Sequence, residues 1–194
     1  MPASDSGYVD YPEILGLPPD FKPADVRRNY RKKIKDLLAE ITGQIMTEDR
    51  RNQYLLQIAQ INAAFYILRD KDLAERYLAD REEVMALEEA WQRAAGDAEA
   101  ADGGRRRFDQ ALRHFLSTYL EEMMLQAGRD PECVENSGWD AAHERHASSV
   151  LRHYRQRLYH QIHERLPYYD VTRPEVDWTE RASFVRGVLR GGNA

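Results

Sequence analysis

The stretch "YRKKIKDLLAEI", residues 30–41, has the pattern of an amphipathic helix with one apolar side and one basic side. Apolar residues recur at helical spacing through this stretch and the turn before it, at Val26, Tyr30, Ile34, Leu37, Leu38 and Ile41. Pro23 suits the first turn of such a helix, and Gly43 suits its end. The pattern predicts a helix that packs its apolar side into a core and leaves its basic side exposed.

A second helix is predicted after Thr47, because the acidic residues Glu48 and Asp49 that follow it suit a helix N-terminus. Its apolar stripe consists of Tyr54, Leu55, Ile58, Ile61, Phe65 and Leu68. The two stripes can face each other, so we expect an antiparallel hairpin. A third helical segment continues to about residue 95, either unbroken or with a break near Asp80.

The sequence predicts an all-α protein with four regions. Residues 1–9 are expected to be a disordered tail, and residues 10–95 a first helical domain. The segment "GDAEAADGGRRR" has no apolar periodicity, so residues 96–106 are expected to be a flexible linker. Residues 107–194 are expected to form a second helical domain with an aromatic tail.

The second half of the chain contains the strongest amphipathic pattern. Its stripe consists of Phe108, Leu112, Phe115, Leu116, Tyr119, Leu120, Met123 and Met124. A loop is expected over residues 129–140, followed by a helix over residues 140–166. The inward positions of that helix are expected to be Ala147, Leu151, Tyr154, Leu158 and Ile162. An extended aromatic connector then leads to a short helix over residues 178–189.

Composition limits the kinds of function that the chain can have. The formal net charge is −5, so the chain as a whole does not favour nucleic acid or an anionic membrane as a partner. The single cysteine, Cys133, is expected to be structural and fits a reducing compartment. The first residues show no secretory signal, and no run of 18 apolar residues occurs, so a cytoplasmic protein is expected.

The first 80 residues resemble a J-domain. "DYPEILGLPPDFKPADVRRNYRKKI" is similar to that family's opening, and "INAAFYILRDKDLAERYL" is similar to its third and fourth helices. The matching positions are Tyr11, Leu15, Tyr30, Ile61, Ala64, Phe65, Leu68, Asp70, Arg76 and Tyr77. The resemblance implies a J-like antiparallel helical hairpin.

The chain departs from the family at its working residues. J-domains act on a partner chaperone through a His-Pro-Asp turn, which counting from Tyr30 should fall near Leu38, Ala39 and Glu40; the chain contains no His-Pro pair. The spacing from Tyr30 to Phe65 resembles that of iron–sulfur-cluster co-chaperones, which also have a helical C-terminal domain. The resemblance therefore implies a J-like shape without stimulation of a chaperone ATPase.

The basic side of the first long helix is the leading candidate for a binding site. The predicted partner-binding residues there are Arg27, Arg28, Arg31, Lys32 and Lys35. In J-domains the matching face docks on an acidic chaperone surface, so here it could bind another acidic protein. A solvated helix face explains the same residues. DNA is a weaker hypothesis, because no base-contacting set accompanies them.

Histidines form the one cluster with catalytic promise, on the helix predicted over residues 140–166. They are His143, His146, His153, His160 and His163. They are expected on a flank away from the core, where pairs three residues apart could share a metal ion. No complete metal-enzyme motif accompanies them, so structural or interfacial histidines, a metal site and a pH-responsive contact all remain open. No catalytic residue, metal ligand or cofactor is assigned.

The C-terminal tail concentrates aromatic residues among arginines, a composition typical of interface centres. Its candidate partner-binding residues are Tyr168, Tyr169 and Trp178, although packing on the chain's own bundle explains them equally well. The sequence therefore favours a non-enzymatic adaptor, assembly factor or subunit of a complex. The alternatives are a divergent J-type co-chaperone of iron–sulfur type and a metal-dependent helical-bundle enzyme.

Overall fold

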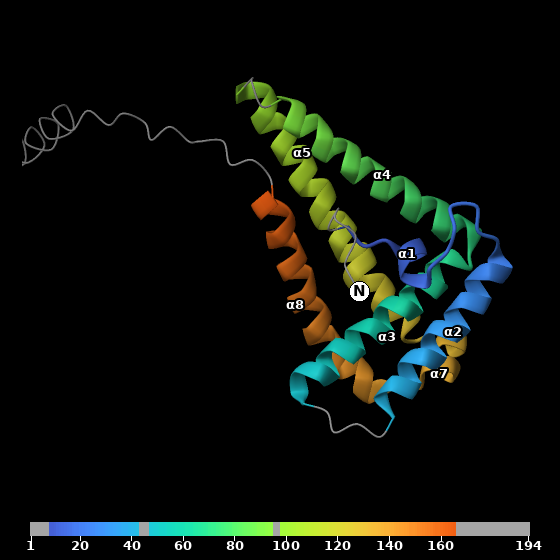
Figure 1. Ribbon diagram of the computed structural model, residues 1–194. Helices are drawn as coiled ribbons and strands as arrows, with labels where there is room; N and C mark the ends of the chain where they lie inside the picture. The colour runs from blue at the N-terminus through green and yellow to red at the C-terminus, as the bar shows by residue number, and fades with distance from the viewer. Residues whose placement is uncertain (1–7, 43–46, 95–97, 166–194) are drawn as a thin grey trace, which may run out of the picture.

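The computed structural model describes residues 8–42, 47–94 and 98–165, and in these residues all regular structure is helical. Figure 1 shows the helices as two crossing hairpins with a final helix beside them. The elements are α1 (Tyr11–Leu15), α2 (Pro23–Ile41), α3 (Glu48–Leu68), α4 (Lys71–Arg93), α5 (Ala98–Ser117), the π-helical turn η2 (Thr118–Glu122), α6 (Met123–Ala127), α7 (Pro131–Ser137) and α8 (Ala141–Arg165). The all-α prediction is confirmed.

Side chains just before several helices fix where those helices begin. The carboxylate of Asp10 accepts a hydrogen bond from the backbone N–H of Glu13 at the start of α1, and Asp70 accepts one from Leu73 at the start of α4. The hydroxyl of Thr47 caps α3 in the same way. Each cap satisfies a backbone donor that the helix itself cannot pair. Gly16, at φ 64°, ends α1 in the left-handed conformation that favours glycine.

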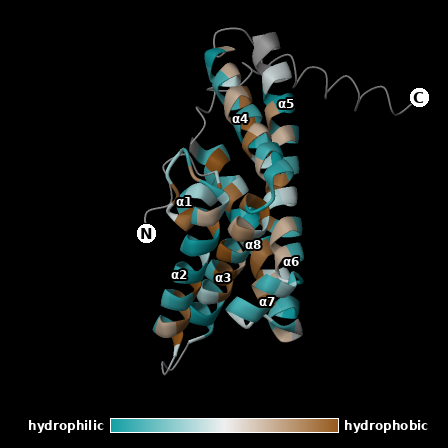
Figure 2. Cartoon of the chain, turned by 90° about the vertical axis from the view of Figure 1, so that its right-hand side faces the viewer, coloured by the Kyte–Doolittle hydropathy of each residue, from teal (hydrophilic) through white to brown (hydrophobic). Residues whose placement is uncertain are grey.

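The predicted hairpin of α2 and α3 is confirmed by its residue pairing. The ring of Tyr30 stacks on Phe65 with centroids 4.1 Å apart, and the Tyr54 hydroxyl donates to Glu40 near the other end. Because later residues of α2 meet earlier residues of α3, the two helices run antiparallel. Figure 2 shows the hydrophobic residues gathered between the helices, where the predicted stripes of α2 and α3 meet.

The expected linker is wrong over residues 98–106, which are helical and belong to α5. α4 is a single helix without a break at Asp80, and α5 packs antiparallel to it: Trp91 stacks on Phe108, and the Tyr119 hydroxyl donates to Asp80. Gly104 lies directly against Trp91, so the two helices approach closely there. Packing on α4 thus outweighs the low helix propensity of the glycines.

Two other segments differ from what the sequence predicts. The predicted disordered tail includes residues 8 and 9, but Tyr8 and Val9 are buried, and the Val9 carbonyl accepts a hydrogen bond from the Tyr77 hydroxyl. Residues 131–137, expected to be loop, form α7, whose first turn is capped by Asp130 and which ends at Gly138 with φ 66°. The predicted helix over residues 140–166 is confirmed as α8.

The π-helical turn positions two other parts of the chain. Its backbone carbonyl at Tyr119 accepts a hydrogen bond from the Tyr11 hydroxyl of α1, and the Glu121 carboxylate lies 3.1 Å from a guanidinium nitrogen of Arg155 on α8. A π-turn shifts the backbone hydrogen-bond ladder, which leaves carbonyl groups available to other partners. The turn therefore joins the N-terminal helix and α8 to the α4–α5 hairpin.

The buried apolar side chains of the described residues form one cluster that includes members from both predicted domains. α3 contacts α2, α4, α6, α7 and α8, so it is the central element. In the described residues we therefore find no separate core on each side of residues 96–106. The J-like arrangement of the first helices remains a prediction.

Candidate protein-binding surface on α2

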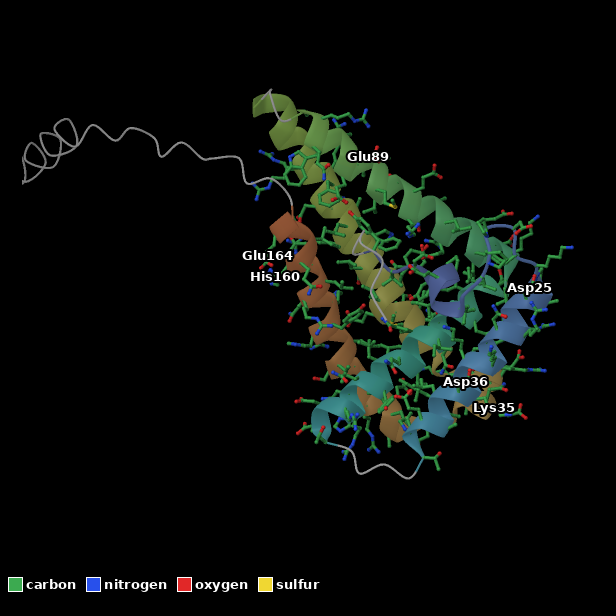
Figure 3. All side chains as sticks on the ribbon, viewed as in Figure 1. Asp25, Lys35, Asp36, Glu89, His160 and Glu164 are labelled. Carbon is green, nitrogen blue, oxygen red and sulfur yellow. The ribbon has the colours of Figure 1, made fainter. Side chains whose placement is uncertain are left out.

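The five candidate cations of α2 share one exposed side of the helix. The side of α2 that points into the core consists of Val26, Tyr30, Ile34 and Leu37. Arg27, Arg31 and Lys35 each follow one of these residues, so they lie on the neighbouring face of the helix. Figure 3 shows Lys35 projecting outward from the bundle beside Asp36. We call this exposed side the α2 basic face, and it consists of Arg27, Arg28, Arg31, Lys32 and Lys35.

Few acidic groups neutralise the α2 basic face. A guanidinium nitrogen of Arg28 lies 2.7 Å from the carboxylate of Asp25, which also accepts a hydrogen bond from the Lys22 backbone and so caps the helix. Arg31 lies 4.0 Å from Glu132 on α7, with 66% of its side chain exposed. Within the described part of the chain, the other three cations make no ion pair: Arg27, Lys32 and Lys35.

A buried polar network holds α2 rigidly behind this face. The Tyr30 hydroxyl donates to the side-chain oxygen of Asn62 on α3 at 3.0 Å, and the amide of Asn62 donates to the Ser137 hydroxyl of α7 at 3.0 Å. Ser137 in turn donates to the carbonyl of Cys133. Each of these partners is buried, so the three helices are locked together by bonds that water does not replace. We call this set the interior junction.

An ion-pair cluster beside the interior junction fixes α7 to the end of α3. Both terminal nitrogens of Arg69 reach Asp130, and one lies 3.3 Å from Glu132. Burial raises the pKa of Asp130, but hydrogen bonds from Arg69 and from the Cys133 backbone outweigh it, and the net pKa is lowered. Because Arg69 binds both acids, α7 keeps Glu132 at the border of the α2 basic face.

Cys133 is part of this structural arrangement. Its side chain is fully buried, and its thiol lies 3.8 Å from the carbonyl oxygen of Asn62. Burial, followed by the charge of Asp130, raises the pKa of the thiol to about 12. The thiol is therefore protonated near neutral pH, as expected for a structural cysteine.

The positions expected for a His-Pro-Asp turn are helical. Leu38, Ala39 and Glu40 lie in the last turns of α2, and the Glu40 carboxylate accepts a hydrogen bond from Tyr54. Residues 43–46, which follow α2, lie outside the described residues. Leu38, Ala39 and Glu40 are therefore part of a helix and do not form the turn that a His-Pro-Asp motif would occupy.

The histidines of α8 do not converge on one point. His143 hydrogen-bonds Asp140 at the start of α8 and stacks on Trp139, whereas His146, His153 and His160 are exposed. Figure 3 shows His160 on the outer side of α8 near Glu164. Among the described residues, no group of three or more His, Cys, Asp and Glu side chains could hold a metal ion.

His163 lies on a flank of α8 that faces α5. It contacts α5, with its Nε2 3.2 Å from Asp109 and its ring 4.4 Å from that of Tyr159. Tyr159 donates to Asp109 and accepts a hydrogen bond from Arg113 at 2.5 Å. Burial raises the pKa of Asp109, but these neighbours outweigh it and the net pKa is lowered. We call these four residues the surface cluster; they join α8 to α5.

Sequence reasoning missed the residues that hold the α2 basic face in place. The main ones are Asn62, Ser137, Arg69 and Glu132. Of these residues, Asn62 is the one that the sequence pattern could have indicated, because it is a polar residue inside an otherwise apolar helical run. The predicted tail residues Tyr168, Tyr169 and Trp178 lie outside the described residues.

No described helix has the length and apolar composition needed to span a membrane. Comparisons with protein-family models, with curated proteins and with solved structures find no significant match to this chain. The resemblance to J-domains therefore depends on the quoted residues alone.

Proposed function

We propose that this protein is a non-enzymatic adaptor or assembly factor that binds an acidic protein surface through the α2 basic face. The main support comes from three cations, Arg27, Lys32 and Lys35, which are exposed and make no ion pair within the described residues. They lie on a helix whose opposite side is locked into the core. Charges held in this way are already arranged for a complementary surface.

The physical properties of such a site follow from its exposure. Exposed charges attract an oppositely charged partner over a distance of about 8 Å at physiological salt, and higher salt weakens that attraction. Each exposed ion pair contributes up to about 1 kcal/mol, so several must act together. The proposed J-like shape without a His-Pro-Asp turn fits docking without activation of a chaperone ATPase.

The first test is to capture partners of the tagged full-length chain from its native cells at low and moderate salt, and to identify them by mass spectrometry. The strongest partner is then purified and its affinity measured directly. Replacing Arg27, Lys32 and Lys35 by glutamate is expected to weaken binding by roughly tenfold or more, because three exposed pairs become repulsive. The far-ultraviolet circular dichroism spectrum is expected to stay unchanged.

A matched control reverses three exposed arginines elsewhere, at Arg51, Arg145 and Arg152, and so changes the net charge equally. Equal loss of binding in both variants would show that overall charge, not the α2 basic face, attracts the partner. Unchanged affinity in the α2 variant would contradict the proposal. Recovery of a DnaK-type chaperone that depends on the α2 basic face would favour the co-chaperone alternative.

A further inference from the structure

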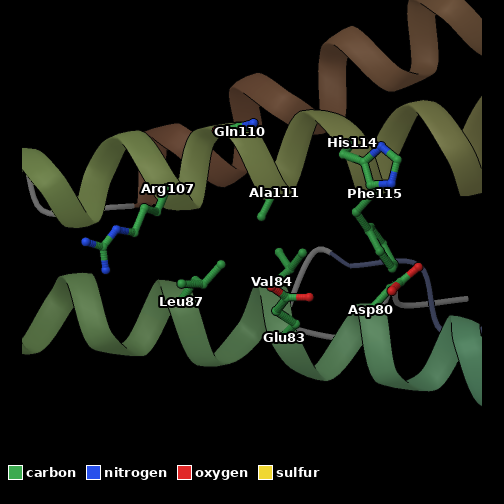
Figure 4. Close-up of a pocket in the computed structure, with 9 residues that line it drawn as sticks. All are labelled: Asp80, Glu83, Val84, Leu87, Arg107, Gln110, Ala111, His114 and Phe115. Atoms are coloured by element: carbon green, nitrogen blue, oxygen red, sulfur yellow. The ribbon is translucent and has the colours of Figure 1, made fainter.

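The antiparallel helices α4 and α5 enclose a groove on the side of α5 opposite to α8. Its volume is about 360 Å³, and its apolar floor includes Val84, Leu87 and Ala111. Figure 4 shows these side chains pointing into the space between the two helices. The groove is open to solvent, and no other described element covers it. An apolar strip of this kind fits the apolar side of a helix.

The α4 wall of the groove is acidic, whereas Arg107 gives the α5 wall a positive charge. Asp80 and Glu83 line the α4 side, whereas Arg107 and His114 line the α5 side. Within the described part of the chain, Glu83, Arg107 and His114 make no hydrogen bond or ion pair. The groove thus offers an acidic wall, an apolar floor and a wall that carries the cation Arg107.

The C-terminal tail begins close to this groove. α8 ends at Arg165, and His163, two residues earlier, contacts Phe108 and Asp109 of α5. Arg107, which lines the groove, is the next residue before Phe108 on the same turn of α5. The groove is therefore about one helix diameter, roughly 10–12 Å, from the start of the tail. The twelve residues 166–177 can span up to about 40 Å.

The charges of the tail match the surfaces along this route. Residues 166–177 contain Asp170, Glu175 and Asp177 against one arginine, and they would cross the outer side of α5, where the cation Arg107 lies. The helix predicted over residues 178–189 has an apolar seam at 100° per residue, consisting of Trp178, Ala182, Val185 and Leu189. Arg186 borders that seam, so it can face the acidic wall of α4.

From these observations we propose that residues 178–189 of the same chain dock as an amphipathic helix in the α4–α5 groove. The apolar seam covers the floor, and Arg186 lies near Glu83. The aromatic tail is then part of the chain's own bundle, and the partner-binding function belongs to the α2 basic face. The outer halves of α4 and α5 gain a third helix on the side that α8 leaves uncovered.

Cysteine cross-linking in the full-length chain tests this placement. One variant combines Ala111→Cys on the floor with Val185→Cys on the seam. A second variant combines Leu87→Cys with Val185→Cys, and it detects a docked helix that is shifted along the groove. The native Cys133 can stay, because its side chain is fully buried. Mild oxidation is expected to give a monomer with an internal disulfide, located by peptide mass spectrometry, in at least one of the two pairs.

A control pair places the first cysteine at the exposed Gln57 of α3 and keeps Val185→Cys. It is expected to form no internal disulfide. The proposal is overturned if neither groove pair forms more internal disulfide than this control pair while circular dichroism shows that all variants are folded. Disulfide-linked dimers without the internal bond also overturn it, because the tail would then occupy a second copy of the chain.

A charge exchange tests the contact between the predicted helix and α4. Glu83→Arg is expected to slow internal disulfide formation by up to about fivefold, because an attractive exposed pair becomes repulsive. Adding Arg186→Glu is expected to restore the rate. Slowing without restoration would overturn the assignment of Arg186 to the acidic wall.

Discussion

The interior junction and the surface cluster both use hydrogen bonds to join distant parts of the chain, but they lie in different surroundings. Asn62 of the interior junction is fully buried and its partners are uncharged. In the surface cluster, Arg113 is exposed and Asp109, Tyr159 and His163 are half-buried. Water can replace a lost bond only where it has access. We therefore expect burial, more than the number of bonds, to decide which cluster contributes more to the stability of the fold.

The largest effect is expected from Asn62→Ala. The change leaves the Tyr30 and Ser137 hydroxyls without a side-chain partner and creates a small cavity, so the free energy of unfolding should fall by about 2–4 kcal/mol. Urea unfolding followed by circular dichroism measures it. Asn52→Ala on the same helix is the control, since the described structure shows no hydrogen bond for that side chain. A loss below 0.5 kcal/mol for Asn62→Ala would remove the distinction between the two clusters.

An intermediate effect is expected from Arg69→Gln, at the border between interior and surface. Loss of the charged hydrogen bonds to Asp130 should lower the free energy of unfolding by about 1–2 kcal/mol at neutral pH. Arg129→Gln, which breaks an exposed pair with Glu144, is the matched control and should cost at most about 0.5 kcal/mol. Equal losses in both variants would contradict the role of burial.

The same variant predicts a pH dependence whose sign follows from Asp130. Its pKa is lower in the folded chain than in the unfolded chain, so the resulting stability is present above about pH 4 and is lost as the pH falls through the folded-state pKa. The urea midpoint should therefore fall less between pH 6 and pH 3 in Arg69→Gln than in the unaltered chain. If the urea midpoint falls equally in the variant and in the unaltered chain, the acid sensitivity belongs to other carboxylates.

The smallest effect is expected from Tyr159→Phe in the surface cluster. The hydroxyl that bridges Arg113 and Asp109 is lost, but the ring keeps its position over the Arg113 guanidinium, 4.5 Å from its carbon to the ring centroid. Because water can reach Arg113, the free energy of unfolding should fall by only about 0.5–1 kcal/mol. A loss above 2 kcal/mol would show that this cluster is as important to stability as the interior junction.

Sequence periodicity predicted the helices whose apolar stripes are long and regular. The stripes of α2 and α3, and the inward positions Leu151 and Leu158 of α8, are where the pattern placed them. Short or glycine-containing segments were predicted less well. α7 has seven residues, and α5 begins in a segment with paired glycines, so in both cases local propensity is weak and tertiary packing decides.

The candidate site shows the same division. The spacing of Arg27, Arg31 and Lys35 placed them on one side of α2, and the structure agrees because helical geometry alone determines which residues share a face. The spacing of the histidines in α8 could not show that His163 turns toward α5. That contact depends on Asp109, a residue 54 positions away in the chain.

Helical periodicity predicted that the protein is helical, which sides of its longest helices are apolar, and where its local basic charge lies. These properties depend on neighbours three or four residues apart. Tertiary contacts, in contrast, bring the buried residues on both sides of residues 96–106 into one cluster, join three helices at Asn62, and leave a groove between α4 and α5. Such features arise from contacts between residues far apart in sequence, and the periodicity of a single helix carries no information about them.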